Sequence, residues 1–308
     1  ANANIQLNNF DNTEGVVYAG EQLQLSATAE LNNTQGVVAA EQLTDLKAGS
    51  VINNAGQIRS QQDQLKLNVQ KDISNQAGEI SAGKSINLNA QKKKKKKGKV
   101  IAGQSLNVTV KQVDNTDGTV YAKDQLHLNV ADQLNNQSGT IAANQHVQIQ
   151  ANSILNTAGK IRSEQNKLTL QVQQDLDNQN GEIFAGTDAD IQASGIDNQT
   201  GTIYSKNQLG LNAKQLNNQQ GQIYSEDQAQ IDVQGDIQNN NGVLLAGKNL
   251  DIQSRLLDNT EGTIRSEKSD LHIAAQGQLL NAQGDIYAAQ NASLNSVGLD
   301  NSSGQIAA

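Results

Sequence analysis

An asparagine followed three residues later by a glycine recurs along this 308-residue chain, and no other feature limits the possible folds as strongly. Successive glycines lie 20, 21 or 22 residues apart, so the chain repeats one short unit about fifteen times. A unit of this length cannot bury an apolar side alone and must stack on its neighbours. The asparagine column comprises Asn12, Asn33, Asn53, Asn75, Asn115, Asn136, Asn156, Asn178, Asn198, Asn218, Asn239, Asn259, Asn281 and Asn301, and only Lys95 interrupts it.

The residues after each glycine alternate in polarity. The second is branched and apolar, as in Val17, the fourth is Ala or Ser, as in Ala19, and the third varies. A second alternating pair follows, such as Leu209 and Leu211. Alternation with period two is typical of a strand with one buried face. We therefore expect an all-β parallel β-helix of about 15 coils, which at about 4.8 Å per coil would be on the order of 70 Å long.

Each recurrent column has a packing explanation. Asn tolerates the left-handed backbone of tight turns and can bond turn backbone groups, and stacked amides can also bond one another along the axis. The glycine is expected to supply a second position with positive φ. The small Ala and Ser side chains leave room where the inner faces of the strands of a coil approach each other. Carboxylates such as Asp11 and Asp258 recur beside the turn asparagine, which indicates turn chemistry.

Composition excludes several classes of function. Only 36% of the residues are hydrophobic and 2% aromatic, but their regular spacing argues against disorder. A formal charge of −8 gives no support for nucleic-acid binding. Cys is absent, no apolar run is long enough for a membrane helix, and no signal peptide opens the chain. Because the pattern is already under way at both ends, we expect residues 1–308 to be a single β-helical segment of a larger protein.

The variable third residue after the glycine is the candidate contact position, because it should face outward. All five tyrosines fall in this column. In register, Phe184, Tyr204 and Tyr224 would form an aromatic ladder, which could bind a glycan or a partner's apolar surface, or could simply stack and cover the sheet. The second interpretation is favoured. The possible contact column comprises Tyr18, Arg59, Tyr121, Arg162, Phe184, Tyr204, Tyr224, Arg265 and Tyr287.

No catalytic, cofactor-binding or metal site is predicted. His127, His146 and His272 lie at unrelated phases of the repeat, and no phosphate-binding loop, nucleophile elbow or calcium repeat occurs. A polysaccharide-cleaving β-helix enzyme remains the alternative, but the chain has no long insertion to shape a substrate groove.

The lysine run Lys92–Lys97 is anomalous. It replaces the turn without changing the register and places Lys93 at a core position, where an unpaired charge costs several kcal/mol. This coil should bulge outward, or the run is an engineered or placeholder tract; a natural polybasic patch is the other possibility.

The segments 134–143 (LNNQSGTIAA), 176–185 (LDNQNGEIFA) and 257–266 (LDNTEGTIRS) resemble the filamentous haemagglutinin repeat of bacterial two-partner secretion exoproteins, including adhesins and CdiA-type toxins of contact-dependent growth inhibition. The resemblance covers the chain apart from Lys92–Lys97. It implies a right-handed parallel β-helix, export through an outer-membrane two-partner secretion transporter that acts on a domain absent here, and secretion or display at the cell surface. It also implies a structural shaft, with a target-cell receptor or glycan as a possible further partner, and it supplies no catalytic residues.

Overall fold

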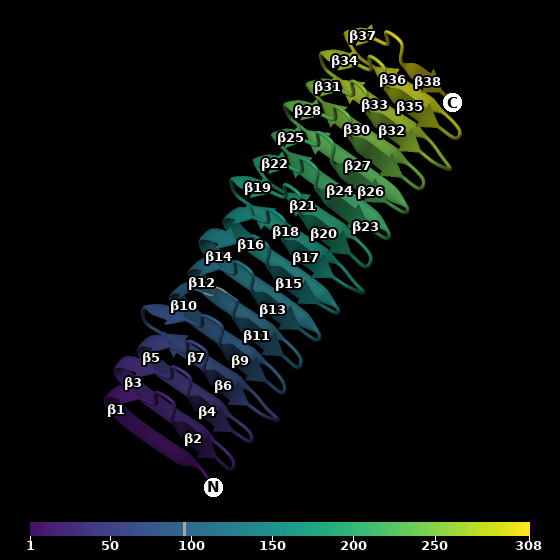
Figure 1. Cartoon of the computed structure of the whole chain (residues 1–308). Helices are drawn as coiled ribbons and strands as arrows, with labels where there is room; N and C mark the ends of the chain where they lie inside the picture. Colours follow the sequence, from purple (N-terminus) through teal and green to yellow (C-terminus); the bar gives the residue numbers. More distant parts are fainter. Residues whose placement is uncertain (95–96) are drawn as a thin grey trace. The chain divides into compact units, whose positions relative to one another are not determined.

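The computed structural model of the chain describes residues 1–94 and 97–308, without the side chains of residues 92–94. These residues form 38 strands and no helix. They divide into two compact units, residues 1–152 (unit 1) and residues 153–308 (unit 2). Within each unit, successive coils of the chain stack as a parallel β-solenoid (Figure 1). The all-β fold of stacked parallel coils expected from the repeat is confirmed.

In unit 1, a coil contributes one short strand and one long strand, and all pairings are parallel. The short strands pair in the order β2 (Val16–Ala19), β4 (Val37–Ala40), β6 (Gln57–Ser60), β9 (Glu79–Ala82), β11 (Lys99–Ala102), β13 (Thr119–Ala122) and β15 (Thr140–Ala143). The long strands pair in the order β1 (Ala3–Asp11), β3 (Leu23–Asn32), β5 (Thr44–Ile52), the successive pieces β7 (Leu65–Val69) and β8 (Asp72–Ser74), β10 (Ile86–Lys94), β12 (Leu106–Asp114) and β14 (Gln125–Asn135). Strand β16 (His146–Leu155) contains residues of both units.

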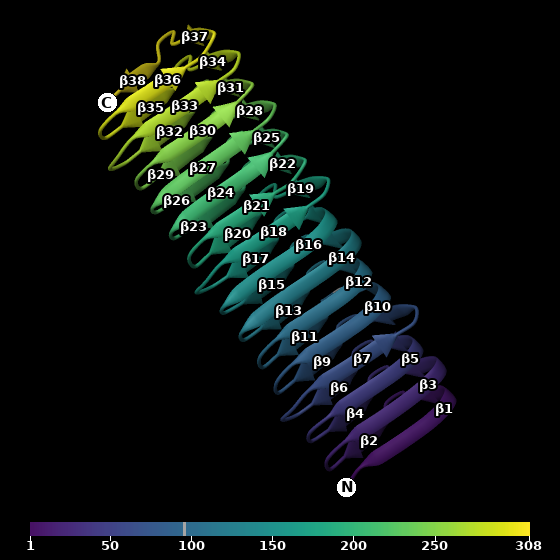
Figure 2. The ribbon, with the colours of Figure 1, turned by 180° about the vertical axis from the view of Figure 1, so that it is seen from behind.

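In unit 2, a coil contributes three strands, and Figure 2 shows the resulting stacks. The first stack is β17 (Lys160–Ser163), β20 (Glu182–Ala185), β23 (Thr202–Ser205), β26 (Gln222–Ser225), β29 (Val243–Ala246), β32 (Thr263–Ser266), β35 (Asp285–Ala288) and β38 (Gln305–Ala307). The second is β18 (Leu168–Val172), β21 (Ala189–Gln192), β24 (Gln208–Ala213), β27 (Gln228–Val233), β30 (Leu250–Ser254), β33 (Leu271–Ala275) and β36 (Ala292–Asn295). The third is β19 (Asp175–Asp177), β22 (Gly195–Asp197), β25 (Gln215–Asn217), β28 (Asp236–Gln238), β31 (Leu256–Asp258), β34 (Gln278–Leu280) and β37 (Gly298–Asp300).

The interior is built from the alternating residues of these strands. In β20, Ile183 and Ala185 are buried, whereas Glu182 and Phe184, which alternate with them, are partly exposed. Ile183 pairs in register with Ile203 of the next coil, so each apolar side chain packs on an equivalent one. In the second stack, Leu209 and Leu211 are buried in the same way. Each coil therefore supplies the apolar partner of its neighbour, as the repeat required.

The left-handed residue of each turn is neither the asparagine nor the glycine. In the turn that begins at Asn178, the Gly181 N–H donates to the Asn178 carbonyl at 2.9 Å, and Asn180 has a φ of 54°. In every repeat the residue just before the column glycine has positive φ, and none of the glycines in the described residues does. Positive φ is unfavourable for residues other than glycine, so the paired strands on either side and the hydrogen bond from Gly181 to Asn178 must hold Asn180 in this conformation. The prediction that the asparagine and the glycine occupy left-handed positions is wrong.

The glycine is required because two coils approach closely at the turn. A Cβ on Gly201 would lie 2.1 Å from the carbonyl oxygen of Asn178, one coil away, and 2.8 Å from Oδ1 of Asn198. Neither atom can move, because one belongs to the backbone and the other to a buried side chain. By contrast, a Cβ on Gly210, outside the turns, would meet nothing nearer than 3.9 Å.

The asparagine side chains form buried ladders inside the turns. Asn178 Nδ2 donates to Oδ1 of Asn198 (2.7 Å), to the Gly181 carbonyl (3.4 Å) and to the Thr202 carbonyl (3.2 Å). Asn178 Oδ1 accepts from Nδ2 of Asn156 at 2.7 Å, and the side chain is fully buried. One amide therefore ties its own turn to the preceding and following coils. This network needs both a donor and an acceptor at every level, which an aspartate or a leucine would not provide.

The lysine run is described only in part. Lys95, which breaks the asparagine column, and Lys96 lie outside the described residues, and nothing is described of the side chain of Lys93. The backbone of β10 continues in register through this region, with Lys93 opposite Ile73 on one side and Val113 on the other. An outward bulge is therefore absent from the backbone of residues 92–94. Downstream, Asn115 Oδ1 is buried and has no partner among the described residues.

Candidate functional site

The most distinctive outer surface of unit 2 lies on the first stack of strands. Because side chains alternate along a strand, the first and third residues of β17, β20, β23, β26, β29, β32 and β35 point outward. We call this surface the aromatic face; it runs from Lys160 and Arg162 on β17 to Asp285 and Tyr287 on β35. Register pairing keeps its two columns continuous from coil to coil.

Aromatic rings on this face stack along the unit. The rings of Phe184 and Tyr204 are 5.3 Å apart between centroids and 20° from parallel, and those of Tyr204 and Tyr224 are 5.3 Å apart and tilted by 44°. The Arg162 guanidinium carbon lies 4.3 Å from the centroid of Phe184 and closes the ladder on that side. The flat faces of Phe184 and Tyr204 are thus covered by neighbours. A sugar ring that stacks on an aromatic face would find only ring edges here.

Charged groups anchor the ladder at its Arg162 end. Arg162 Nε lies 2.8 Å from Oε1 of Glu164, and a second nitrogen pairs with Glu182 on the next coil. The hydrogen bonds from Arg162 hold the pKa of the Glu164 carboxyl below its usual value, although burial raises it. Burial raises the pKa of the Tyr204 phenol, and its hydrogen bond to Glu226 raises it further. Tyr204 therefore stays protonated across the physiological range.

The predicted contact column is continuous only in part of the described structure. Beyond Tyr224 the column continues with Leu245, Arg265 and Tyr287, and the Arg265 guanidinium lies 4.9 Å from the Tyr287 ring centroid.

In unit 1, Ala39 stands between Tyr18 and Arg59, and Ser81 and Ile101 stand between Arg59 and Tyr121. Tyr18 donates to Glu41 at 3.0 Å, and Tyr121 donates to Asn144 at 2.9 Å. The unit 1 members are thus scattered side chains that do not form a ladder.

The first residue after each glycine also belongs to this face, and the sequence analysis did not single it out. In unit 2 this column carries the charges Lys160, Glu182 and Asp285, with uncharged residues between the last two. The signal was present in the sequence, because the position has the same outward phase as the aromatic column. The charged residues of this column occur too irregularly along the chain for the column to be recognised before the coils are aligned.

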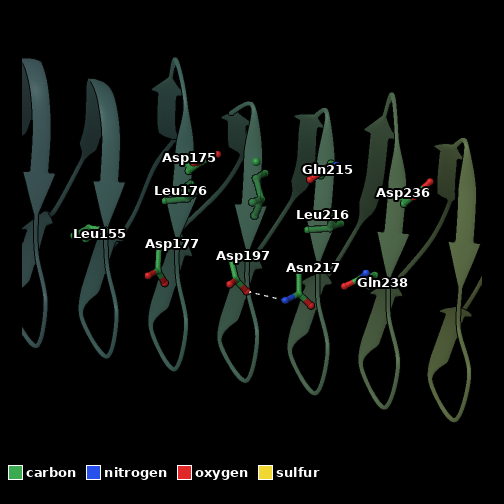
Figure 3. Close-up of a pocket in the computed structure, with 12 residues that line it drawn as sticks. Leu155, Asp175, Leu176, Asp177, Asp197, Gln215, Leu216, Asn217, Asp236 and Gln238 are labelled. Carbon is green, nitrogen blue, oxygen red and sulfur yellow. Dashed lines mark hydrogen bonds between the residues drawn. The ribbon is translucent and has the colours of Figure 1, made fainter.

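A hollow of about 510 Å³ lies on the third stack of unit 2 and is rich in acidic and amide side chains (Figure 3). Asp197 accepts hydrogen bonds from Gln199 N (3.1 Å) and from Asn217 Nδ2 (3.1 Å), and Asp236 pairs with Arg255 at 2.5 Å. Asp177 accepts from the backbone N–H of Gln179 at 2.9 Å. These carboxylates organise turns and neighbouring coils, which is the turn chemistry that their recurrence indicated.

Within residues 1–94 and 97–308, no group of three His, Cys, Asp or Glu side chains is placed so that it could hold a metal ion. The same part of the chain contains no helix long and apolar enough to cross a membrane.

Comparison with models of known protein families shows the family of this chain. The model of the haemagglutinin repeat matches residues 1–77, 64–137, 128–180, 168–241, 230–283 and 280–308, which together cover the chain. The chain belongs to the haemagglutinin repeat family. The resemblance to filamentous haemagglutinin inferred from the turn segments is confirmed, and the match also spans the lysine run. Searches among curated proteins and among solved structures found no match. The haemagglutinin repeat is typical of structural and adhesive regions, and the β-solenoid described above fits an adhesin-like shaft.

Proposed function

We propose that this haemagglutinin-repeat chain is the shaft of a bacterial exoprotein that is secreted or displayed at the cell surface. The shaft presents adhesive or toxin modules, carried elsewhere in the parent protein, to another cell. The single observation behind this proposal is the equivalence of the coils. Within each unit, most described coils share the same backbone ladders and apolar columns, which supports a role that depends on the stack as a whole.

The mechanism is mechanical presentation. Parallel strands share any load along the stack over several backbone ladders, and the buried amide ladder adds a side-chain connection at each turn. Length is set by the number of coils, because each coil adds about 4.8 Å. We infer export through an outer-membrane two-partner secretion transporter, and delivery of a growth-inhibition toxin is one use of such a shaft. Family membership supports both inferences.

Deletion of whole blocks of coils in the parent exoprotein tests this role. Gly56, Gly159 and Gly262 are 103 residues apart, so removing residues 57–159 or residues 160–262 joins equivalent turn positions and removes five coils in either case. A shaft predicts the same change in contact with target cells for both deletions, with equal surface display measured by immunolabelling. If only the deletion of residues 160–262 abolishes contact, the shaft role is wrong and that block carries a binding site.

The second candidate is a direct adhesin that binds glycan or protein through the aromatic face. The observation that favours it is the outward position of the continuous ladder of Phe184, Tyr204 and Tyr224, which would meet a target through its ring edges. Replacing all three residues by Ser in the parent exoprotein should lower adhesion strongly if this face binds the target. The matched control is replacement of Tyr18 and Tyr121 by Ser, because these tyrosines occupy the same column without forming a ladder. Unchanged adhesion in the triple variant eliminates this candidate.

A further inference from the structure

Two turns of unit 2 place an asparagine directly before the column glycine. Asn180–Gly181 and Asn241–Gly242 are the two Asn-Gly pairs of the sequence. The glycine is obligatory, because a Cβ on Gly181 would lie 2.3 Å from the carbonyl oxygen of Asn156, one coil away. The residue before the glycine is unrestricted, since other coils carry Glu, Gln, Ala, Lys, Asp, Ser or Thr there. The choice of Asn at this position therefore decides which coils carry an Asn-Gly pair.

An Asn-Gly pair is chemically reactive, because glycine has no side chain to hinder attack by its own backbone nitrogen on the asparagine amide. The nitrogen gives up its proton and bonds to Cγ of the asparagine. The bond from Cγ to Nδ2 then breaks, and Nδ2 takes up a proton through water and leaves as ammonia. Water opens the resulting five-membered succinimide at one of its two carbonyl carbons. The products are aspartate and isoaspartate, in which the main chain runs through the side chain.

The stacked turn opposes the first step at Asn180. The Gly181 N–H donates to the Asn178 carbonyl at 2.9 Å, and Gly181 is buried although Asn180 is exposed. Ring closure requires this nitrogen to lose its proton and to rotate next to Cβ of Asn180, which breaks the hydrogen bond. The next coil holds Asn180 as well, because its N–H donates to the Gln199 carbonyl at 3.1 Å and its Oδ1 accepts from Oγ1 of Thr200 at 2.8 Å.

The turn at Asn241 has the same arrangement. The Gly242 N–H donates to the Asn239 carbonyl at 2.9 Å, and the Asn241 N–H donates to the Thr260 carbonyl of the next coil at 3.1 Å. Gly242 is buried and Asn241 is exposed. In both turns the reactive nitrogen is thus occupied only while the coil is closed and stacked.

We propose that Asn180 and Asn241 are deamidation sites that stacking protects and that react when their coil opens. Local opening frees the glycine nitrogen and lets the asparagine rotate, so the rate of reaction follows the population of the open coil. The reaction is a property of the turns and does not require the shaft role.

The two products differ in whether the coil can close again. Aspartate fits, because Asp117 stands at the equivalent position with a φ of 54° and its turn is closed by the Gly118 N–H, which donates to the Asn115 carbonyl at 3.0 Å. Isoaspartate adds one atom to the main chain between Gln179 and Gly181, where the turn must close. A coil that stays open long enough to form isoaspartate is therefore prevented from stacking again, which makes its opening irreversible.

Peptide mapping by mass spectrometry measures deamidation at both sites in residues 1–308, incubated at one mildly alkaline pH. Both sites should react at least about a hundredfold more slowly in the folded chain than in guanidinium chloride that unfolds it, because interior coils open rarely. Concentrations of denaturant below the unfolding transition should raise both rates progressively. Equal rates in the folded and unfolded chains at either site would overturn the proposal.

Two glycine substitutions are designed to open one turn each. A Cβ on Gly201 would lie 2.1 Å from the Asn178 carbonyl oxygen, next to the first site. A Cβ on Gly262 would lie 2.2 Å from the Asn239 carbonyl oxygen, next to the second site. Because each coil contacts only its neighbours, each substitution should act mainly on one site.

Gly201→Ala should speed deamidation of Asn180 at least about tenfold and leave Asn241 near the parent rate, and Gly262→Ala should do the reverse. The matched control is Gly210→Ala, whose Cβ lies in open space and which should change neither rate. Equal acceleration of both sites in a variant that is folded by circular dichroism would overturn the local protection. If a variant does not fold, the denaturant series on the parent chain still decides.

Refolding of chains aged in guanidinium chloride tests the effect of the product. Molecules with isoaspartate at position 180, separated by chromatography, should lose amide hydrogen-exchange protection around this turn. The matched control is Asn180→Asp, which makes the same charge change without lengthening the main chain and should keep the protection of the parent. Isoaspartate-containing molecules that are protected as well as Asn180→Asp would overturn the irreversibility.

Discussion

Replacing Asn178 by Leu tests the buried amide ladder with the same branching and the same number of side-chain heavy atoms. The substitution removes the contacts of the two Nδ2 hydrogens with three acceptor oxygens and the hydrogen bond that Oδ1 accepts. Asn156 Nδ2 keeps two carbonyl partners, at 3.2 and 3.3 Å, and the Gly181 carbonyl keeps a backbone donor at 2.9 Å. Oδ1 of the fully buried Asn198 loses its donor. An unsatisfied buried acceptor costs about 1–3 kcal/mol, so we expect a loss of that size in the free energy of unfolding.

Urea denaturation of the full chain, followed by far-ultraviolet circular dichroism, measures this loss. Amide hydrogen exchange should show weakened protection centred on residues 156–202, because the stability of a repeat stack is a sum of local terms. The matched control is Asn212→Leu, on the exposed side of β24, which should change stability by less than about 0.5 kcal/mol. A denaturation profile of Asn178→Leu that coincides with the parent or with this control refutes the role of the ladder.

Three further results follow from the same geometry. Gly201→Ala should destabilise the chain by more than about 1 kcal/mol because its Cβ enters the adjacent coil, whereas Gly210→Ala, in open space, should be neutral or stabilising, as judged by denaturation midpoints. Lys95→Asn should raise the midpoint, because an amide there could complete the interrupted asparagine column; an unchanged or lower midpoint contradicts this. The Tyr204 phenol, whose pKa is raised above 10.0 by burial and by its bond to Glu226, ionises earlier in the unfolded chain. Stability should therefore fall as the pH rises above 10, and Tyr204→Phe should remove the last step of tyrosine ionisation in an absorbance titration and lessen this fall.

Most of the fold could be predicted from the sequence, because period-two alternation fixes which side chains are buried and the spacing of the glycines fixes the length of a coil. Ile183 and Ala185 are buried as the pattern required, and the amide of Asn178 bonds its equivalents in both neighbouring coils. The position of the left-handed residue was missed, because Asn180 and its equivalents are Glu, Gln, Ala, Ser and other types with no common signature. The flanking strands impose that conformation, and residue preference does not reveal it.

The sequence correctly placed a glycine in each turn, but the reason predicted for it, a positive φ, was wrong. A glycine in a turn usually signals positive φ, and only the approach of the Asn178 carbonyl to Gly201 shows that space is the limiting factor. The aromatic ladder was visible in the sequence, whereas the covering of its ring faces required the positions of Arg162 and Tyr224.

The spacing between paired strands has a consequence for how such a chain can fold and lengthen. Ile183 and Ile203, like other pairs of adjacent coils, are about one repeat apart in the chain. Parallel sheets usually fold slowly, because distant segments must meet and the entropy of loop closure opposes them. Here the loop that closes at each step has the same length whether the stack is short or long. Inserting a 103-residue block therefore adds coils without adding any contact of higher sequence separation, so chain growth by duplication leaves the kinetic barrier at each step unchanged.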